Sequence, residues 1–133
     1  MIESCENHGE IKATGSLAAG GIVGACRAIT IKDCTNDGKV SSASSAAGGI
    51  VGYNDTTTAT LTNCKNTGTV SGEENETGGI VGRISGALKD CTTTGTDVVL
   101  VGTLGAREEK NTISYSNETE ITLPSVIKGN VSL

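Results

Sequence analysis

A pentapeptide that recurs at a nearly constant distance places the strongest constraint on the fold of this 133-residue chain. Gly-Gly-Ile-Val-Gly occupies residues 20–24, 48–52 and 78–82, with start-to-start spacings of 28 and 30 residues, and a degraded fourth copy spans residues 98–102. Repeats with a period between about 20 and 50 residues are typical of solenoids, in which each unit is one small supersecondary element stacked on the next. The pentapeptide therefore predicts a stack of coils.

A second recurring phrase fixes the register between these coils. It begins with an aliphatic residue, has Cys three positions later, and continues with Asn and Gly at alternate positions, over residues 2–9, 31–38, 61–68 and, in degraded form, 88–95. Four copies at the same point of each unit predict that equivalent residues lie over one another along a common axis. The predicted structural columns comprise Cys5, Cys34, Cys64 and Cys91; Asn7, Asn36 and Asn66; and Ile22, Ile50 and Ile80.

Extended-strand geometry predicts where each unit bends. Cys34 and Asn36 have the same parity and face one side of a strand, whereas Ile31 reaches the same interior only if the chain bends at residues 32–33. Each unit then holds about three short extended segments, one of which is the pentapeptide. We predict an all-β fold, a right-handed parallel β-helix of about four coils with a period near 28–30 residues. An all-β sandwich, the competing architecture, does not require the same phrase at the same point of every unit.

The repeat pattern divides the chain into two segments. It covers residues 1–102 and then stops, whereas residues 103–133 contain the only proline, Pro124, and alternating stretches that suit strands. An open β-helix exposes apolar surface and unpaired strand edges at each end, so we expect the second segment to be a C-terminal cap or connector. Because the first residues already belong to a repeat, we also expect the chain to be a fragment of a larger protein.

The interior of such a coil has to be filled with small side chains. The chain has no Phe or Trp, two Tyr and 19 Gly, so aliphatic residues, Cys and Gly must form a core of thin layers. We expect the four column cysteines to be free thiols that fill space, because stacked parallel neighbours point their Cβ atoms the same way and a disulfide needs a dihedral angle of about 90°. Cys26 stands outside the column and is expected to be exposed. The asparagine column is expected to bond backbone groups at the turns and its own stacked copies.

Groups that could carry chemistry are sparse. His8 is the only histidine and cannot by itself build a metal site or a Ser-His-Asp or Cys-His arrangement, and no two cysteines have the spacing of a zinc site. No His, Arg or Lys recurs beside the acidic residues that are candidates for catalysis. We therefore expect these acidic side chains to lie on the solvated surface. These candidates are Asp33, Asp37, Asp55, Asp90 and residues 73–76. We therefore predict no catalytic residue, no metal ligand and no bound cofactor.

Charge and hydropathy narrow the possible partners. The net charge of -5 argues against nucleic acid and anionic membranes, both of which bind clustered Lys and Arg. No run of about 18 apolar residues is present to insert into a membrane. A protein or a glycan is the expected partner, with Tyr53 and Tyr115 as the aromatic platforms for a sugar. End-to-end self-association is also expected, because the first repeat has no cap of its own.

The pentapeptide at a period near 30, preceded by Asn-x-Gly-x-Val, resembles the GLUG motif. This repeat occurs in large bacterial surface and secreted proteins, among them metallopeptidases that cleave immunoglobulin A and surface proteins of Bacteroidetes. The resemblance covers residues 2–102 and implies a β-solenoid segment at the cell surface or outside the cell. The zinc-binding His-Glu-x-x-His motif of the peptidases is missing from this sequence, so peptidase activity is not implied.

Together these observations predict a non-catalytic, adhesin-like module of an exported bacterial protein, which serves as a stalk or as an adhesion and interaction segment. The alternative is a carbohydrate-binding or carbohydrate-active β-helix that uses one lateral face. An enzyme of that kind requires acidic and basic groups that converge from neighbouring coils.

Overall fold

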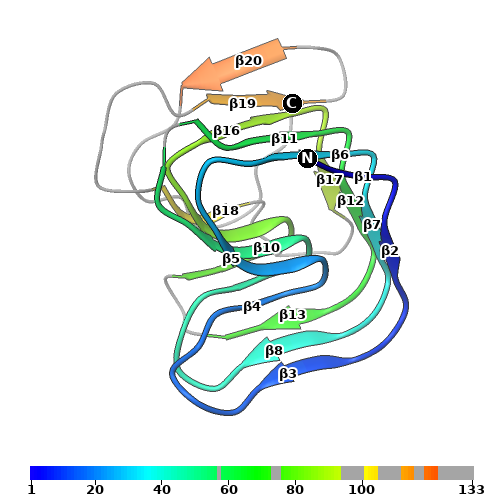
Figure 1. Cartoon of the computed structure of the whole chain (residues 1–133), viewed down its shortest axis with the longest axis vertical. Coiled ribbons are helices and arrows are strands. Elements are labelled where there is room, and N and C mark those ends of the chain that lie inside the picture. The colour runs from blue at the N-terminus through cyan, green and yellow to red at the C-terminus, as the bar shows by residue number, and fades with distance from the viewer. Residues whose placement is uncertain (57, 73–75, 94–100, 105–111, 116–118, 123–133) are drawn as a thin grey trace.

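The computed structural model describes residues 1–56, 58–72, 76–93, 101–104, 112–115 and 119–122, which form a parallel β-solenoid (Figure 1). The described part contains strands, turns and bends and no α-helix, so the predicted all-β parallel fold is confirmed. No helix there has the length and apolar character needed to cross a bilayer. The described residues form about three complete turns and three strands of a fourth unit, so the predicted count of four coils is approximate.

Each complete coil contributes one strand to each of five sheets. The first coil comprises β1 (Ile2–Glu3), β2 (Glu6–Asn7), β3 (Ile11–Ala13), β4 (Ala19–Gly20) and β5 (Val23–Cys26). The second comprises β6 (Thr30–Lys32), β7 (Thr35–Asn36), β8 (Val40–Ser42), β9 (Ala47–Gly48) and β10 (Val51–Asn54). The third comprises β11 (Thr60–Thr62), β12 (Lys65–Asn66), β13 (Val70–Ser71), β14 (Thr77–Gly78) and β15 (Val81–Ile84). The fourth, incomplete unit supplies β16 (Ala87–Lys89), β17 (Thr92–Thr93) and β18 (Val101–Leu104).

Neighbouring coils pair in the register that the repeated phrases predict. Ile31 of β6 pairs with Ile2 on one side and with Leu61 on the other. Val51 of β10 pairs in the same way with Val23 and Val81. Every pairing between these coils is parallel, so equivalent positions of successive repeats lie next to one another along the solenoid axis.

The predicted bend before each cysteine is a residue with left-handed backbone geometry. Ser4, Asp33, Asn63 and Asp90 have φ angles of 55°, 53°, 51° and 53°. Asn and Asp enter this region more readily than other residues with a Cβ atom, because their short polar side chains bond locally. The side-chain amide of Asn63 donates to Oδ1 of Asp33 at 2.7 Å, which joins two successive corners on the outside of the solenoid.

The pentapeptide is itself a corner, and the expectation that it forms one strand was wrong. In the first repeat β4 ends at Gly20, the chain bends through Gly21 and Ile22, and β5 begins at Val23. Five short strands per coil therefore replace the three segments that we expected. The second glycine makes the corner possible, because a Cβ atom at Gly21 would collide with the backbone of the next coil and with the Asn36 side chain.

Aliphatic side chains fill the interior in layers about one residue thick. The largest fully buried side chains are Ile31, Ile50, Leu61, Ile80, Ile84, Leu88, Val40, Val51 and Val81. Ile22, the first member of the predicted isoleucine column, is only partly buried, since it belongs to the end coil. The core thus needs no aromatic residue among the described positions.

Beyond the last coil, two further strands extend the sheet that contains β1. β19 (Thr112–Tyr115) pairs in parallel with β16, and β20 (Thr119–Thr122) pairs antiparallel with β19. Both strands lie in the segment 103–133, at one end of the solenoid (Figure 1). The boundary at residue 102 stays a prediction, and β18 continues across it.

Candidate functional site

The interior asparagines form a hydrogen-bonded ladder along the solenoid. Nδ2 of Asn7 donates to Oδ1 of Asn36 at 2.8 Å, and Nδ2 of Asn36 donates to Oδ1 of Asn66 at 2.7 Å. Each amide also donates to the carbonyl oxygen of the glycine two residues later, at 2.8 Å for Asn36. The ladder thus satisfies buried turn carbonyls that the sheets leave unpaired.

The ladder ends where the fourth unit has Thr93 in place of Asn. The Thr93 hydroxyl oxygen is buried and has no hydrogen-bond partner among the described residues. A hydroxyl is too short to repeat the bond that Asn36 makes to Asn66. With Thr93 at this position, the chain of side-chain hydrogen bonds stops at Asn66.

The column cysteines are free thiols with a second repeated contact. Cys34, Cys64 and Cys91 are fully buried, whereas Cys5 in the end coil is exposed. Each sulfur donates to the carbonyl oxygen two residues earlier, across the left-handed corner, at 3.2 Å for Cys34. Burial raises the pKa of Cys34, and the neighbouring Cys64 thiol together with burial raises the pKa of Cys91 well above its ordinary value. Cys34 and Cys91 are therefore protonated at neutral pH, whereas the hydrogen bond with the Cys91 thiol lowers the pKa of Cys64.

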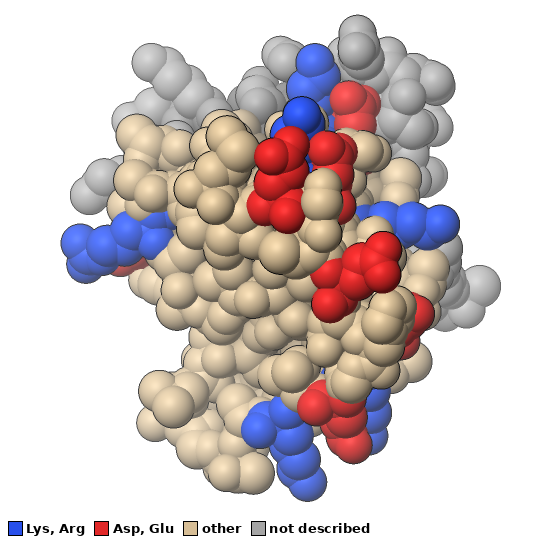
Figure 2. Space-filling model, turned by 45° about the vertical axis from the view of Figure 1, so that its right-hand side comes forward, with Lys and Arg blue, Asp and Glu red and all other residues tan. Residues whose placement is uncertain are grey.

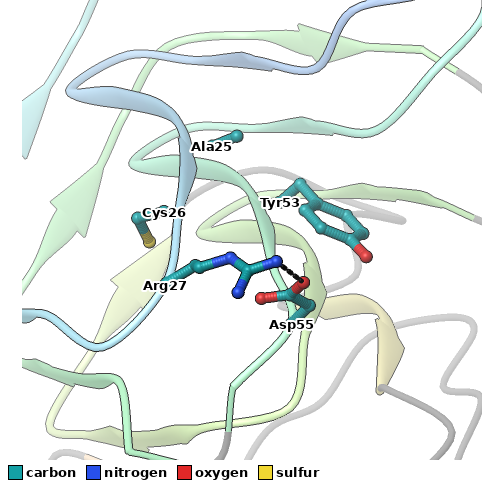
Figure 3. A pocket seen from close by; sticks show the side chains of 5 residues that line it. All are labelled: Ala25, Cys26, Arg27, Tyr53 and Asp55. Atoms are coloured by element: carbon teal, nitrogen blue, oxygen red, sulfur yellow. Dashed lines mark ion pairs between the residues drawn. The ribbon is translucent and has the colours of Figure 1, made fainter.

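On the outside, the candidate site is a shallow hollow at the carboxyl ends of β5 and β10. It has a volume of about 290 Å³ and is lined by Ala25, Cys26, Arg27, Tyr53 and Asp55 (Figure 3). A hollow of this size lies at the lower limit of small-molecule sites, which start at about 300 Å³.

The hollow exists because one column combines three side chains of very different size. Tyr53 pairs in register with Ala25 of the coil before it and with Arg83 of the coil after it. The Arg83 guanidinium lies over the Tyr53 ring, 5.6 Å from its centroid, and Arg83 also contacts Glu76 at 3.2 Å. The small Ala25 provides no such cover, so the side of Tyr53 next to Ala25 borders open space.

A loose ion pair forms the polar side of the hollow. Nη2 of Arg27 lies 3.7 Å from Oδ2 of Asp55, and the Arg27 side chain is 83% exposed. An exposed pair at this distance contributes about 1 kcal/mol or less to stability, so the guanidinium can turn toward a ligand at little cost. Oδ1 of Asp55 is buried and has no partner among the described residues, which leaves Oδ2 as the oxygen that a ligand can reach.

Asn54 fixes the backbone beneath the hollow. Its side chain is fully buried, and Nδ2 donates to the carbonyl oxygens of Cys26 at 3.2 Å and Arg27 at 3.1 Å. Its Oδ1 accepts a bond from the backbone N–H of Ser85 at 3.4 Å, so one side chain links three coils. Cys26 is half-buried rather than exposed as expected, and burial raises its pKa, so it is a poor nucleophile.

Several of the other charged groups form ion pairs within a coil or between neighbouring coils. His8 contacts Asp37 at 2.8 Å and Glu6 at 3.2 Å, and Asp37 raises the pKa of this exposed imidazole most, followed by Glu6. Lys32 contacts both Glu3 and Asp33. Figure 2 shows charged groups scattered over a largely uncharged surface. Within the described residues, no three His, Cys, Asp or Glu side chains gather as a metal site would require.

Only some of the residues around this hollow were named as candidates from the sequence. Tyr53 was named as a sugar platform, and Asp55 and Cys26 were considered singly, but Arg27 and Arg83 were missed. A signal was present, because Ala25, Tyr53 and Arg83 each follow the pentapeptide directly. Tyr115 and residues 73–75 were also candidates; the Tyr115 side chain and these residues lie outside what the structure describes.

Comparison with known proteins identifies one repeat. Residues 43–71 match the family model described as the GLUG motif. These residues run from the end of β8 to the end of β13 and therefore close one full turn of the solenoid. No curated protein and no solved structure gives a significant match.

Proposed function

Because residues 43–71 form a GLUG motif that closes one turn of a β-solenoid, we propose that this chain is a non-catalytic repeat module of a bacterial cell-surface or secreted protein. It acts there as a stalk or as an adhesion and interaction segment. The observation that carries the proposal is the interior, where side-chain columns such as Asn36 to Asn66 join each coil to the next. Such columns favour a stiff element that adds length in regular steps.

The chemistry of the described residues supports a non-catalytic role. The one histidine is exposed and lies between two carboxylates, and the pKa values of the buried Cys34 and Cys91 thiols are raised. Three of the acidic side chains that we considered lie next to a residue of the preceding or following coil: Asp37 next to His8, Asp33 next to Asn63 and Asp55 next to Arg27. Nucleophilic and acid–base catalysis both need a base within reach of an activated group, and this arrangement does not provide one.

An extracellular or surface location is compatible with the free cysteines. Oxidising compartments convert accessible thiols to disulfides, but Cys34, Cys64 and Cys91 have no exposed surface. Their burial protects them without any bridge.

End-to-end association with a second copy is part of the proposal. Addition of one coil buries positions that the first coil leaves open: Ile2 and Cys5 are accessible, whereas Ile31 and Cys34 are fully buried. The strands of the first coil also have unpaired edges, which favour pairing with another chain. Light scattering over a wide concentration range that found only monomers would contradict this part.

Two experiments test the main proposal. Antibodies raised against the purified chain should label intact cells of a bacterium that produces the parent protein; labelling only after lysis would contradict the surface location. Incubation with a panel of polysaccharides and peptides should release no reducing ends and no new amino termini. If repeated purification of the chain did not remove an activity that releases reducing ends or new amino termini, the non-catalytic role would be contradicted.

A further inference from the structure

The hollow beside Tyr53 has the features of a ligand site, and the stalk role does not use them. The hollow is lined by the aromatic side chain of Tyr53, the small side chain of Ala25, a donor, Arg27, and an acceptor, Asp55 (Figure 3). Small-molecule sites are typically apolar surfaces with a few polar groups that fix orientation. The buried Asn54 holds the two strand ends in place, so the site is built on rigid elements.

The charges around the hollow indicate a neutral ligand. Arg27 faces Asp55 and Arg83 faces Glu76, so two positive groups are matched by two negative groups. An anionic ligand would need a surplus of positive charge, and a cationic ligand would need unpaired carboxylates. A neutral molecule with hydroxyl groups can accept a bond from Arg27 and donate one to Oδ2 of Asp55 without separating more than one weak ion pair.

Shape and size narrow the ligand further. One face of the Tyr53 ring is occupied by Arg83, which holds the ring upright from the side of the third coil. On the side of Ala25 no large side chain covers Tyr53, and the hollow there has a volume of about 290 Å³ for a ligand. The C–H face of a pyranose fits an aromatic ring, while its hydroxyl groups point to the edge where Arg27 and Asp55 lie.

We propose that this hollow binds one uncharged pyranose residue of a glycan, with Tyr53 as the stacking platform and the Arg27–Asp55 pair as the hydroxyl-binding edge. Because the hollow is shallow and a single sugar has few atoms, the dissociation constant is about millimolar. Such weak sites are effective when many copies act together, as on a cell surface. The proposal does not depend on the stalk role, since a secreted binder would use the same residues.

The test is a two-dimensional ¹H–¹⁵N NMR titration of the chain with methyl glycosides of glucose, galactose, mannose and N-acetylglucosamine. At least one glycoside should shift the amides of residues 25–27 and 53–55 in a saturable way. Tyr53→Ala should abolish these shifts, Tyr53→Phe should retain them because the ring face is kept, and Arg27→Ala should weaken binding several-fold. Lys12→Ala, which removes an exposed side chain on β3 that does not line the hollow, is the control and should leave the titration unchanged.

Three outcomes would overturn the proposal. The first is the absence of saturable shifts at the hollow with every glycoside. The second is binding that Tyr53→Ala leaves intact while the variant keeps the wild-type spectrum elsewhere. The third is tighter binding of methyl glucuronide than of the uncharged methyl glucoside, which would identify an anion site centred on Arg27. None of these results bears on antibody labelling of intact cells, so failure of the sugar site and failure of the surface role can be distinguished.

Discussion

A Cβ atom placed on Gly21 would lie 2.6 Å from Cγ of Asn36, one coil further along the solenoid. In the first two pentapeptides the second glycine therefore lies against the asparagine of the next phrase, and in the third pentapeptide Gly79 lies against Thr93, which stands at the same repeat position. In the next repeat, a Cβ atom placed on Gly49 would lie 2.6 Å from Nδ2 of Asn66. Real Cβ atoms do not approach this closely, so Gly21 and Gly49 are required by the asparagine and by the backbone of the coil that follows them.

Gly49→Ala should therefore destabilise the chain by about 1–3 kcal/mol or more, because the new methyl group must displace the ladder or the backbone. Gly15→Ala is the control, since no atom lies within 4 Å of the Cβ position there. Chemical denaturation compares the two variants. Equal stability of Gly49→Ala and wild type would contradict the contact.

The asparagine ladder predicts one loss and one gain of stability. Asn36→Ala removes the side-chain donor to the Gly38 carbonyl and breaks the bonds of Asn36 to Asn7 and Asn66, which should cost about 1–3 kcal/mol. Thr93→Asn should instead extend the ladder by one step and raise the melting temperature, because it replaces an unpaired buried hydroxyl. The ladder would not have the role described here if Thr93→Asn lowered the melting temperature.

The cysteines should divide by reactivity according to burial. Iodoacetamide at mildly alkaline pH should modify exposed Cys5 first and half-buried Cys26 more slowly, because burial raises the Cys26 pKa. Cys34, Cys64 and Cys91 should react only after unfolding. Mass spectrometry of tryptic peptides measures each site, and rapid native modification of Cys64 would be incompatible with the stacked interior.

His8 should titrate above its ordinary value of about 6.5, because Asp37 and Glu6 favour the imidazolium. Since the pKa is raised in the folded chain, the associated stability is fully present below about pH 6.5 and is lost as pH rises through the higher folded pKa. A ¹H NMR titration is unambiguous, because the chain has one histidine. Asp37→Asn should lower the pKa; a wild-type value at or below 6.5 would refute the pairing.

The sequence correctly predicted features that recur in every repeat. Equal spacing predicted the stacked coils and their register, and the opposite parities of Ile31 and Cys34 predicted the corner that Asp33 occupies. The corner inside the pentapeptide was missed, because a short apolar run between glycines suits a strand as well as a turn. The hollow was missed as a unit, because it depends on the different sizes of Ala25, Tyr53 and Arg83 rather than on a repeated letter.

The central claim is that equivalent residues of successive repeats lie side by side in parallel register. NOE spectroscopy tests it directly by measuring proton–proton proximity between Ile31 and Leu61 and between Val51 and Val81, which pair in the structure. The account predicts cross-peaks for both pairs in the pattern of parallel strands. Strong Hα–Hα cross-peaks typical of antiparallel hairpins, or no contact between residues 30 positions apart, would contradict it.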